Sequence, residues 1–294
     1  MKLWFYWVLL KNKCNIFFCF GGFYFMFTGI RTIKMNNDQI CRVYENNNDF
    51  DLLINEYLIM QDEDGKTKDK LRWSGTEFIK INYEKVKDFK PKSDKQSCLF
   101  DLLCNKDIPI RIVCGVPGSG KSRCCITYGL HFVNTQIYSN LFVVRHNAGI
   151  GEKNGYLPGD KFQKILNWLG FLEDNLGDTQ YTIQEMYDRG MLKVDSVEYM
   201  KGRDIKDSFI IIDESEDLTE DQFKMLGERP SGESVICFVG DYEQATQEKY
   251  KQSSGLKRAI EKLKGNPKVG IIVFDDKYND NVRGDVSKIF TYLY

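Results

Sequence analysis

Runs of apolar, mostly β-branched residues recur along the C-terminal two thirds of this chain. They lie at residues 110–114, 141–145, 209–212, 234–239 and 270–274. These runs show little alternation with polar residues, which is typical of parallel strands that are buried on both faces. The stretches between them, such as residues 122–132, carry apolar residues at helical spacing. The pattern therefore predicts an α/β fold with a parallel sheet and helices on both faces.

The first 34 residues differ from the rest of the chain. Residues 14–30 carry no charge and are close to the short end of a membrane span, which needs about 17–25 residues. A membrane anchor and a signal peptide are two interpretations of this segment. A third is that translation starts at Met35, where an ordinary polar sequence begins. We favour the third and expect no membrane association.

Residues 35–95 form a second region, which precedes the apolar repeat. Strands are predicted at 52–60, 70–73 and 77–81, with polar turns between them. This small β segment is too short to build a large core of its own. The lysine-rich stretch 85–95 contains Pro91 and is interpreted as a linker. We therefore divide the chain into a leader (1–34), a β segment with linker (35–95) and an α/β domain (96–294).

A glycine-rich loop separates the first strand of the repeat from the helix that follows. Residues 115–122 match G-x-x-x-x-G-K-[ST], the phosphate-binding loop in which backbone N–H groups surround phosphate oxygens. Lys121 is expected to reach the β- and γ-phosphates, and the Ser122 hydroxyl to ligate Mg²⁺. The helix N-terminus adds a partial positive charge. The expected nucleotide contacts are Gly115, Val116, Pro117, Gly118, Ser119, Gly120, Lys121, Ser122 and Arg123.

The strand at 209–212 runs into an acidic pair, as a Walker B strand does. Asp213 is expected to hold the Mg²⁺ shell, and Glu214 to act as the general base that activates water. Such a base indicates hydrolysis and disfavours a small-molecule kinase. The strand at 234–239 ends in Gly-Asp-Tyr-Glu-Gln, and Gln244 is the candidate sensor of the γ-phosphate. Asp213, Glu214 and Gln244 together predict an ATP-hydrolysing site.

One further nucleotide contact is predicted upstream of the first strand. Gln96 opens an amphipathic helix that extends to Cys104. Its amide offers an acceptor and two donors, which suit the edge of an adenine base. An exposed glutamine at a helix start explains the position equally well, so both interpretations stay open.

Composition and charge limit the possible binding partners of the chain and indicate its cellular compartment. The chain has 294 residues, 42% hydrophobic content and a net charge of −1, so it can bury a full core but has no global basic signature for nucleic acid. Any nucleic-acid contact must use a local patch. The nine cysteines include no C-x-x-C pair, which suits reduced thiols in a cytoplasmic protein.

Basic and aromatic residues in two glycine-rich loops supply a candidate for that patch. Lys153, Lys161, Lys201 and Arg203 would contact phosphates, and Tyr156 and Tyr199 would stack on bases. Ordinary surface loops have the same charge pattern, so this interpretation also stays open.

These motifs together resemble the PhoH-like ATPases, a group of RecA-like NTPases related to the superfamily 1 helicase core. The resemblance covers about residues 96–294. It is carried by the phosphate loop, Arg145, Gly151–Asp160, Tyr199–Arg203, Ile212–Glu214, Thr219–Met225, Gly240–Gln244, Ser254–Leu256 and Asn281–Arg283. The family implies ATP binding and hydrolysis. Members that are fused to a PIN nuclease domain are associated with RNA unwinding and cleavage, and we expect no PIN domain in this chain.

The chain departs from the family pattern beside its acidic pair. Where the family usually has Ala-Gln-Asn, this chain has Ser215, Glu216 and Asp217. The resemblance links the family's glutamine to coupling between the ATP state and a nucleic-acid face, and this chain lacks that glutamine. His146 replaces a usual proline, and Tyr242-Glu243 replaces a usual Pro-Thr.

A single RecA-like domain lacks the second lobe that completes a superfamily 1 site. We therefore expect a homo-oligomer, for example a hexameric ring, in which a neighbouring subunit supplies an arginine. Arg283 is the candidate, with Arg203 and Arg258 as fallbacks. The expected function is an ATPase or helicase dependent on single-stranded RNA or another nucleic acid. The alternative is a nucleotide-dependent switch that binds a protein partner without translocation.

Overall fold

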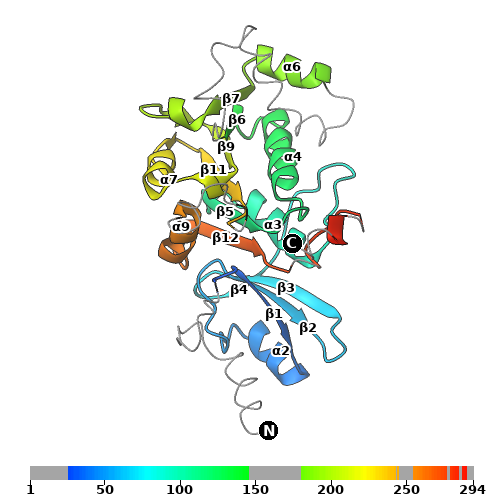
Figure 1. Cartoon of the computed structure of the whole chain (residues 1–294). Helices are drawn as coiled ribbons and strands as arrows, with labels where there is room; N and C mark the ends of the chain where they lie inside the picture. The colour runs from blue at the N-terminus through cyan, green and yellow to red at the C-terminus, as the bar shows by residue number, and fades with distance from the viewer. Residues whose placement is uncertain are drawn as a thin grey trace.

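A six-stranded parallel sheet forms the centre of the molecule (Figure 1). The computed structural model describes residues 26–145, 180–242, 244, 254–276, 279–284 and 287–289. The strand order is β12-β5-β11-β9-β6-β7, and every neighbouring pair is parallel. The strands are β5 (Ile110–Gly115), β6 (Asn140–Arg145), β7 (Leu192–Ser196), β9 (Ser208–Asp213), β11 (Val235–Gly240) and β12 (Val269–Phe274). This architecture confirms the predicted RecA-like α/β fold.

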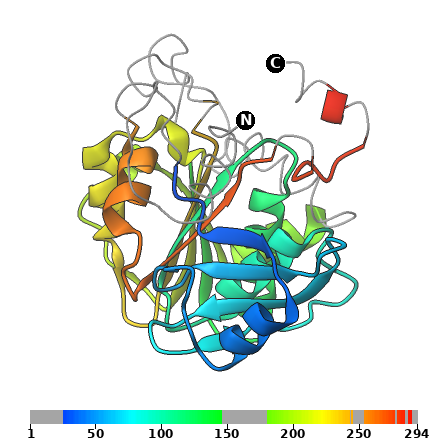
Figure 2. The ribbon, with the colours of Figure 1, turned by 90° about the horizontal axis from the view of Figure 1, so that it is seen from below.

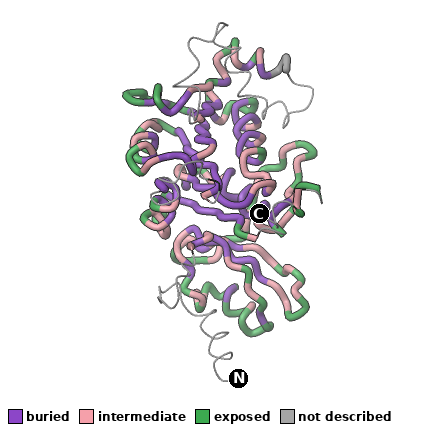
Figure 3. The backbone as a smooth tube through the Cα atoms, viewed as in Figure 1, coloured by how far each residue is buried: buried purple, intermediate pink, exposed green. Residues whose placement is uncertain are grey.

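Both faces of the sheet are buried, as the continuous apolar runs require. In β9, Phe209 and Ile211 point into one core cluster, whereas Ile210 and Ile212 point into the other. The edge strand β7 was not predicted, because Leu-Lys-Val-Asp-Ser alternates in polarity. Figure 3 shows that buried residues follow the central strands and that exposed ones lie on the outer turns.

Helices cover both faces of the sheet. On one face lie α3 (Asp94–Cys104), α4 (Lys121–Asn134) and α6 (Gln180–Asp188), whose buried residues share one core cluster. On the other lie α7 (Glu220–Gly227) and α9 (Gly255–Leu263). Two 3-10 turns, η1 (Val197–Tyr199) and η2 (Ser215–Asp217), and the short strands β8 (Ile205–Lys206) and β10 (Pro230–Ser231) complete this second layer.

A smaller four-stranded sheet lies below the main sheet in Figure 1 and faces the viewer in Figure 2. Its order is β1-β2-β3-β4, with bounds β1 (Ile30–Lys34), β2 (Tyr57–Gln61), β3 (Thr67–Trp73) and β4 (Phe78–Lys80). The helix α2 (Asn37–Tyr44) supplies Val43 to the core of this unit. The strand predicted at 52–60 is shorter than expected, because residues 54–55 form a turn in which Asn55 has a positive φ of 65°.

The boundary expected at residue 34 does not match the structure. β1 lies inside the predicted leader and pairs in parallel with β2. The chain just before it also reaches the main sheet, since the Val273 N–H donates to the Thr28 carbonyl at 2.8 Å. A Cβ on Gly29 would lie 1.7 Å from the Ile271 carbonyl oxygen, so glycine permits this approach. Residues 26–34 therefore belong to the folded unit.

The small sheet shares its core with the larger domain. Ile30, Tyr57 and Ile59 belong to the same buried cluster as α3 and α4. The Tyr57 hydroxyl also donates to Asp101 on α3 at 2.8 Å. The predicted linker contributes as well, because Val86 and Phe89 pack against this cluster. Among the described residues, no helix is long and apolar enough to span a bilayer.

Candidate nucleotide-binding site

The phosphate loop lies at the carboxyl end of β5 and leads directly into α4. Gly118 and Gly120 have positive φ values of 80° and 83°, which aim the backbone inward. A Cβ on Gly118 would lie 2.5 Å from the side-chain oxygen of Asn281, so the loop has no room for a larger residue here. The Ser119 hydroxyl donates to the Val116 carbonyl at 2.8 Å and holds the turn closed. The loop and the helix N-terminus together form an anion-binding cradle.

Lys121 folds into this cradle. Its Nζ donates to the carbonyls of Gly115 and Val116, with the second contact at 2.8 Å. Burial lowers its pKa, and the charges of Asp241, Glu216 and Asp213 oppose that shift. A partly buried cation beside the loop suits a site that accepts phosphate, and the nearby carboxylates suit a metal ion that accompanies the phosphate.

The two halves of the predicted Mg²⁺ site meet at adjacent strand ends. Ser122 Oγ donates to Asp213 Oδ1 at 3.0 Å. Burial raises the pKa of Asp213, while Arg145 and the Ser122 hydrogen bond act in the opposite direction. A hydroxyl and a carboxylate oxygen on neighbouring elements are ligands that Mg²⁺ prefers. Among the described residues, no group of three or more His, Cys, Asp and Glu side chains forms another candidate metal site.

Glu214 follows Asp213 in the left-handed backbone region, with φ 54° and ψ 44°. Its carboxylate forms an ion pair with Arg145, the last residue of β6. The same guanidinium lies beside Asp213, with Nε 3.6 Å from Oδ2. Register places Arg145 directly opposite Asp213, which explains why one arginine meets both acids. No role was predicted for Arg145, although a polar residue at a strand end beside the Walker B strand is a signal that sequence analysis can use.

The residue that follows β11 contacts the acidic segment after the Walker B strand. The Asp241 N–H donates to Glu216 Oε2 at 3.0 Å, and both residues are buried. Burial raises the pKa of Glu216 to about 7. Gln244, the predicted sensor, is exposed, and its N–H donates to the Asp241 carbonyl at 2.9 Å. Its sensor role stays a prediction, whereas Glu216 and Asp241 are the contacts that sequence analysis missed.

The segment 281–283 lies against the phosphate loop of its own chain. The Val282 N–H donates to the Gly118 carbonyl at 3.1 Å, and the Asn281 side chain accepts from the Arg283 N–H at 2.9 Å. A Cβ on Gly118 would lie 3.2 Å from Arg283 Cδ. Lys95 anchors this segment by pairing with Asp280 at 2.6 Å. Arg283 thus lies beside the phosphate loop of its own chain, and its expected role toward a neighbouring subunit stays a prediction.

The other arginines considered for that role have partners of their own. Arg203 pairs with Asp195 at 2.5 Å, and Arg258 lies 3.5 Å from Glu220.

Gln96 touches the phosphate loop and has both ends of its amide engaged. Its Nε2 donates to the Ser119 carbonyl at 2.8 Å, and its Oε1 accepts from the Lys92 N–H at 2.7 Å. The side chain is buried, with 4% of the residue exposed. The expected contact with an adenine edge therefore does not match this arrangement, because Gln96 joins α3 to the loop backbone. Arg123, at the start of α4, places its guanidinium 5.8 Å from the centre of the Phe89 ring.

Comparison with known proteins identifies the family. A family model described as PhoH-like protein matches residues 88–294. This chain belongs to the PhoH-like family. PhoH-like proteins are P-loop NTPases, so the chain is a nucleotide-binding protein.

Curated relatives of this PhoH-like chain share about a third of its residues over the matched region. Protein PhoH2 of Bacillus subtilis is 31% identical over 235 residues, which cover 74% of this chain and 52% of that protein. The PhoH-like protein of the same organism is 30% identical over 164 residues, or 55% of this chain and 51% of the relative. Protein PhoH2 of Mycolicibacterium smegmatis is 30% identical over 181 residues, which cover 60% of this chain and 41% of that protein. The chain thus spans about half the length of the curated relatives it matches.

The basic loops of this PhoH-like chain are only partly described. Lys153, Lys161 and Tyr156 lie outside the described residues. Tyr199 is 69% exposed at the end of η1, and Lys201 is exposed as well.

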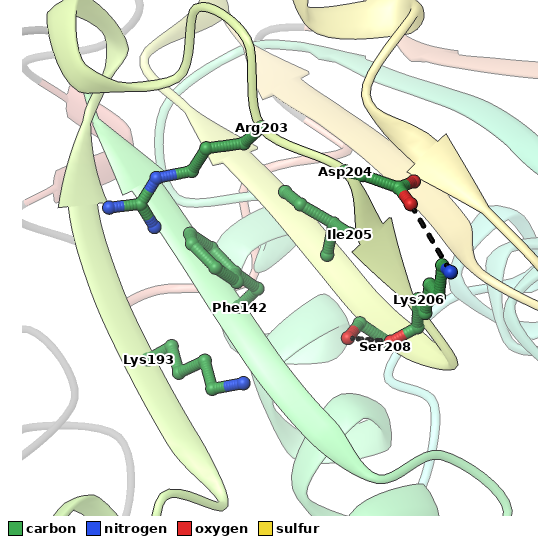
Figure 4. A pocket seen from close by; sticks show the side chains of 7 residues that line it. All are labelled: Phe142, Lys193, Arg203, Asp204, Ile205, Lys206 and Ser208. Atoms are coloured by element: carbon green, nitrogen blue, oxygen red, sulfur yellow. Dashed lines mark hydrogen bonds and ion pairs between the residues drawn. The ribbon is translucent and has the colours of Figure 1, made fainter.

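Arg203 lines a hollow of about 280 Å³ with Phe142, Lys193 and Lys206 (Figure 4). Its guanidinium lies 5.7 Å from the centre of the Phe142 ring. Lys193 and Phe142 lie near the amino ends of their strands, so this hollow lies at the opposite end of the sheet from the phosphate loop.

Proposed function

We propose that this PhoH-like protein binds ATP with Mg²⁺ and hydrolyses it to ADP and phosphate. The observation that carries the proposal is the contact between Ser122 and Asp213, with Glu214 next in the chain. It brings a phosphate loop, a metal-binding pair and a water-activating carboxylate to one end of the sheet. This set supports hydrolysis rather than phosphate binding alone.

The residues of the chain have distinct roles in this reaction. Backbone N–H groups of the loop and Lys121 would hold the β- and γ-phosphates. Glu214 would accept a proton from water as the water oxygen bonds to the γ-phosphorus and the bond to the β,γ-bridging oxygen breaks. Ser122 and Asp213 would hold Mg²⁺, which neutralises phosphate charge when bound. Arg283, in cis beside Gly118, would stabilise the negative charge that develops on the phosphates.

We further propose that single-stranded RNA or another nucleic acid is the partner that stimulates turnover. The exposed Tyr199 and Lys201 support this, since stacking and charge are what a single strand requires. The described cysteines are all free thiols, which supports a cytoplasmic location. We also propose a homo-oligomer, because a single RecA-like domain lacks the second lobe that completes a superfamily 1 site.

The test is a steady-state ATPase assay with and without single-stranded RNA, together with the native mass. Turnover that rises several-fold with RNA supports the nucleic-acid-dependent ATPase. ATP binding without turnover, with or without RNA, would favour the nucleotide-dependent switch. A double substitution of Tyr199→Ala and Lys201→Ala should remove the stimulation and leave basal turnover intact, whereas Lys224→Ala, on the exposed side of α7, serves as the matched surface control.

A further inference from the structure

One arginine engages both acids of the Walker B pair. Arg145 ends β6, and its guanidinium pairs with Glu214 and lies beside Asp213. The Arg145 side chain is 26% exposed, so the contact is partly screened from water. Asp213 in turn accepts from Ser122 in the phosphate loop. A single chain of contacts therefore runs from the loop through Asp213 to Arg145 and on to Glu214.

The backbone of Glu214 supports a specific position for its carboxylate. A non-glycine residue in the left-handed region costs about 1–2 kcal/mol, so its surroundings must stabilise it. The ion pair with Arg145 supplies such stabilisation and directs the side chain toward β6. A carboxylate that accepts from a guanidinium is held by that contact and points at its partner. Glu214 in this position is therefore engaged with β6 and is not free to orient a water molecule.

We propose that Arg145 is a positioning residue that holds Glu214 in a resting position and releases it when a nucleoside triphosphate binds. The inference rests on the proposed ATPase function and adds a step that precedes the chemistry. A γ-phosphate carries more charge than one carboxylate, and a guanidinium can form two parallel hydrogen bonds to it. The triphosphate thus competes with Glu214 for Arg145, whereas a diphosphate, which lacks the γ-phosphate, does not.

A double-mutant cycle in thermal unfolding tests this release without measuring turnover. The variants are Arg145→Gln, Glu214→Gln and the combination, each measured without nucleotide, with Mg²⁺ and a non-hydrolysable ATP analogue, and with Mg²⁺ and ADP. We expect a coupling of about 2–4 °C in the melting temperature without nucleotide and with ADP. It should fall to near zero with the analogue. If Arg145→Gln does not fold, Arg145→Lys replaces it, because an ammonium keeps the charge but cannot form the same fork.

The chain offers a matched control pair. Arg42 and Asp49 form an exposed ion pair at 2.6 Å in the small β unit. The cycle with Arg42→Gln and Asp49→Asn should give the same coupling in all three states. A coupling between Arg145 and Glu214 that persists with the analogue would overturn the release and leave a purely structural ion pair.

The outcomes also separate this inference from the proposed function. If nucleotides shift the melting temperature of the wild type and the coupling changes, but no turnover is found, the hydrolysis proposal fails and the release stands. If turnover is found and the coupling does not change, the release alone fails. If no nucleotide shifts the melting temperature, both fail.

Discussion

Ser122 Oγ and Asp213 Oδ1 lie 3.0 Å apart, although the two residues are 91 positions apart in the chain. The contact exists because β5 and β9 both end at the same edge of the sheet, with β11 between them. Ser122 enters from the first turn of α4, and Asp213 ends β9. This relationship converts two separate sequence motifs into one site, and the predictions below follow from its surroundings.

Two substitutions should separate nucleotide binding from hydrolysis. Lys121→Ala removes the cation that meets the phosphates and should abolish binding or turnover. Glu214→Gln keeps the shape of the side chain but removes the base, so it should bind ATP and lose turnover by about 100-fold or more. Equilibrium binding of a fluorescent ATP analogue and a phosphate-release assay measure the two effects. Comparable turnover in wild type and Glu214→Gln would contradict the general-base role.

Arg283→Ala should reduce turnover at least about tenfold and change ATP affinity little, because the arginine acts on charge that develops during the reaction. Since Arg283 lies beside the loop of its own chain, mixing this variant with Glu214→Gln should restore no activity. Phosphate release from the mixture, compared with each variant alone, checks this. Recovery of activity on mixing would show that the arginine acts between subunits. Arg229→Ala, which removes an arginine that caps α7, is a control for loss of charge.

Glu216 should make stability depend on pH. Its pKa is raised by burial from 4.5 to about 7, so the folded state favours the protonated form. The stability that it contributes is complete below pH 4.5 and is lost as the pH rises to about 7. Glu216→Gln should therefore raise the free energy of unfolding by up to about 3 kcal/mol at pH 8 and by little at pH 4. Thermal unfolding without nucleotide or metal, with exposed Glu228→Gln as control, measures the difference. An equal gain at both pH values would rule out this titration.

Removal of β1 should destabilise the protein. A chain that begins at Met35 loses the parallel partner of β2 together with buried Phe27 and Ile30. Burial of these two side chains is worth at least about 3 kcal/mol, so the melting temperature should fall by several degrees. A chain that begins at Met26 retains these contacts and is the matched control. Equal melting temperatures for the two would show that β1 adds nothing to the fold, as the expected start at Met35 requires.

Gln96→Ala should weaken ATP and GTP binding to a similar extent. The amide holds the Ser119 carbonyl and the Lys92 N–H, so its loss disturbs the loop whichever base is attached. Competition binding with both nucleotides measures the ratio of affinities. A selective loss of ATP affinity would instead support direct contact of Gln96 with adenine.

The strands of the main sheet and the chemistry at their ends could be predicted from the amino-acid sequence. Strands such as 110–114 and 209–212 are recognisable because burial on both faces demands continuous apolar runs. The phosphate loop is recognisable because its backbone conformation demands glycine at fixed spacing. These constraints are local, so each leaves a pattern that can be recognised in the amino-acid sequence. Edge strand β7 and short strand β1 escaped prediction, because partly exposed strands need no such run.

Which side chains of the site meet could not be predicted from the sequence, because it depends on how the elements pack. Arg145 pairs with Glu214 because strand register places it opposite Asp213. The register between β6 and β9 cannot be recognised from the sequence of either strand. Arg283 lies on its own phosphate loop, since the chain after β12 turns back over β5 and Lys95 holds Asp280. Gln96 contacts the backbone of the phosphate loop because its helix, α3, packs beside that loop. Contacts between distant segments depend on how elements pack, and packing is a property of the whole chain.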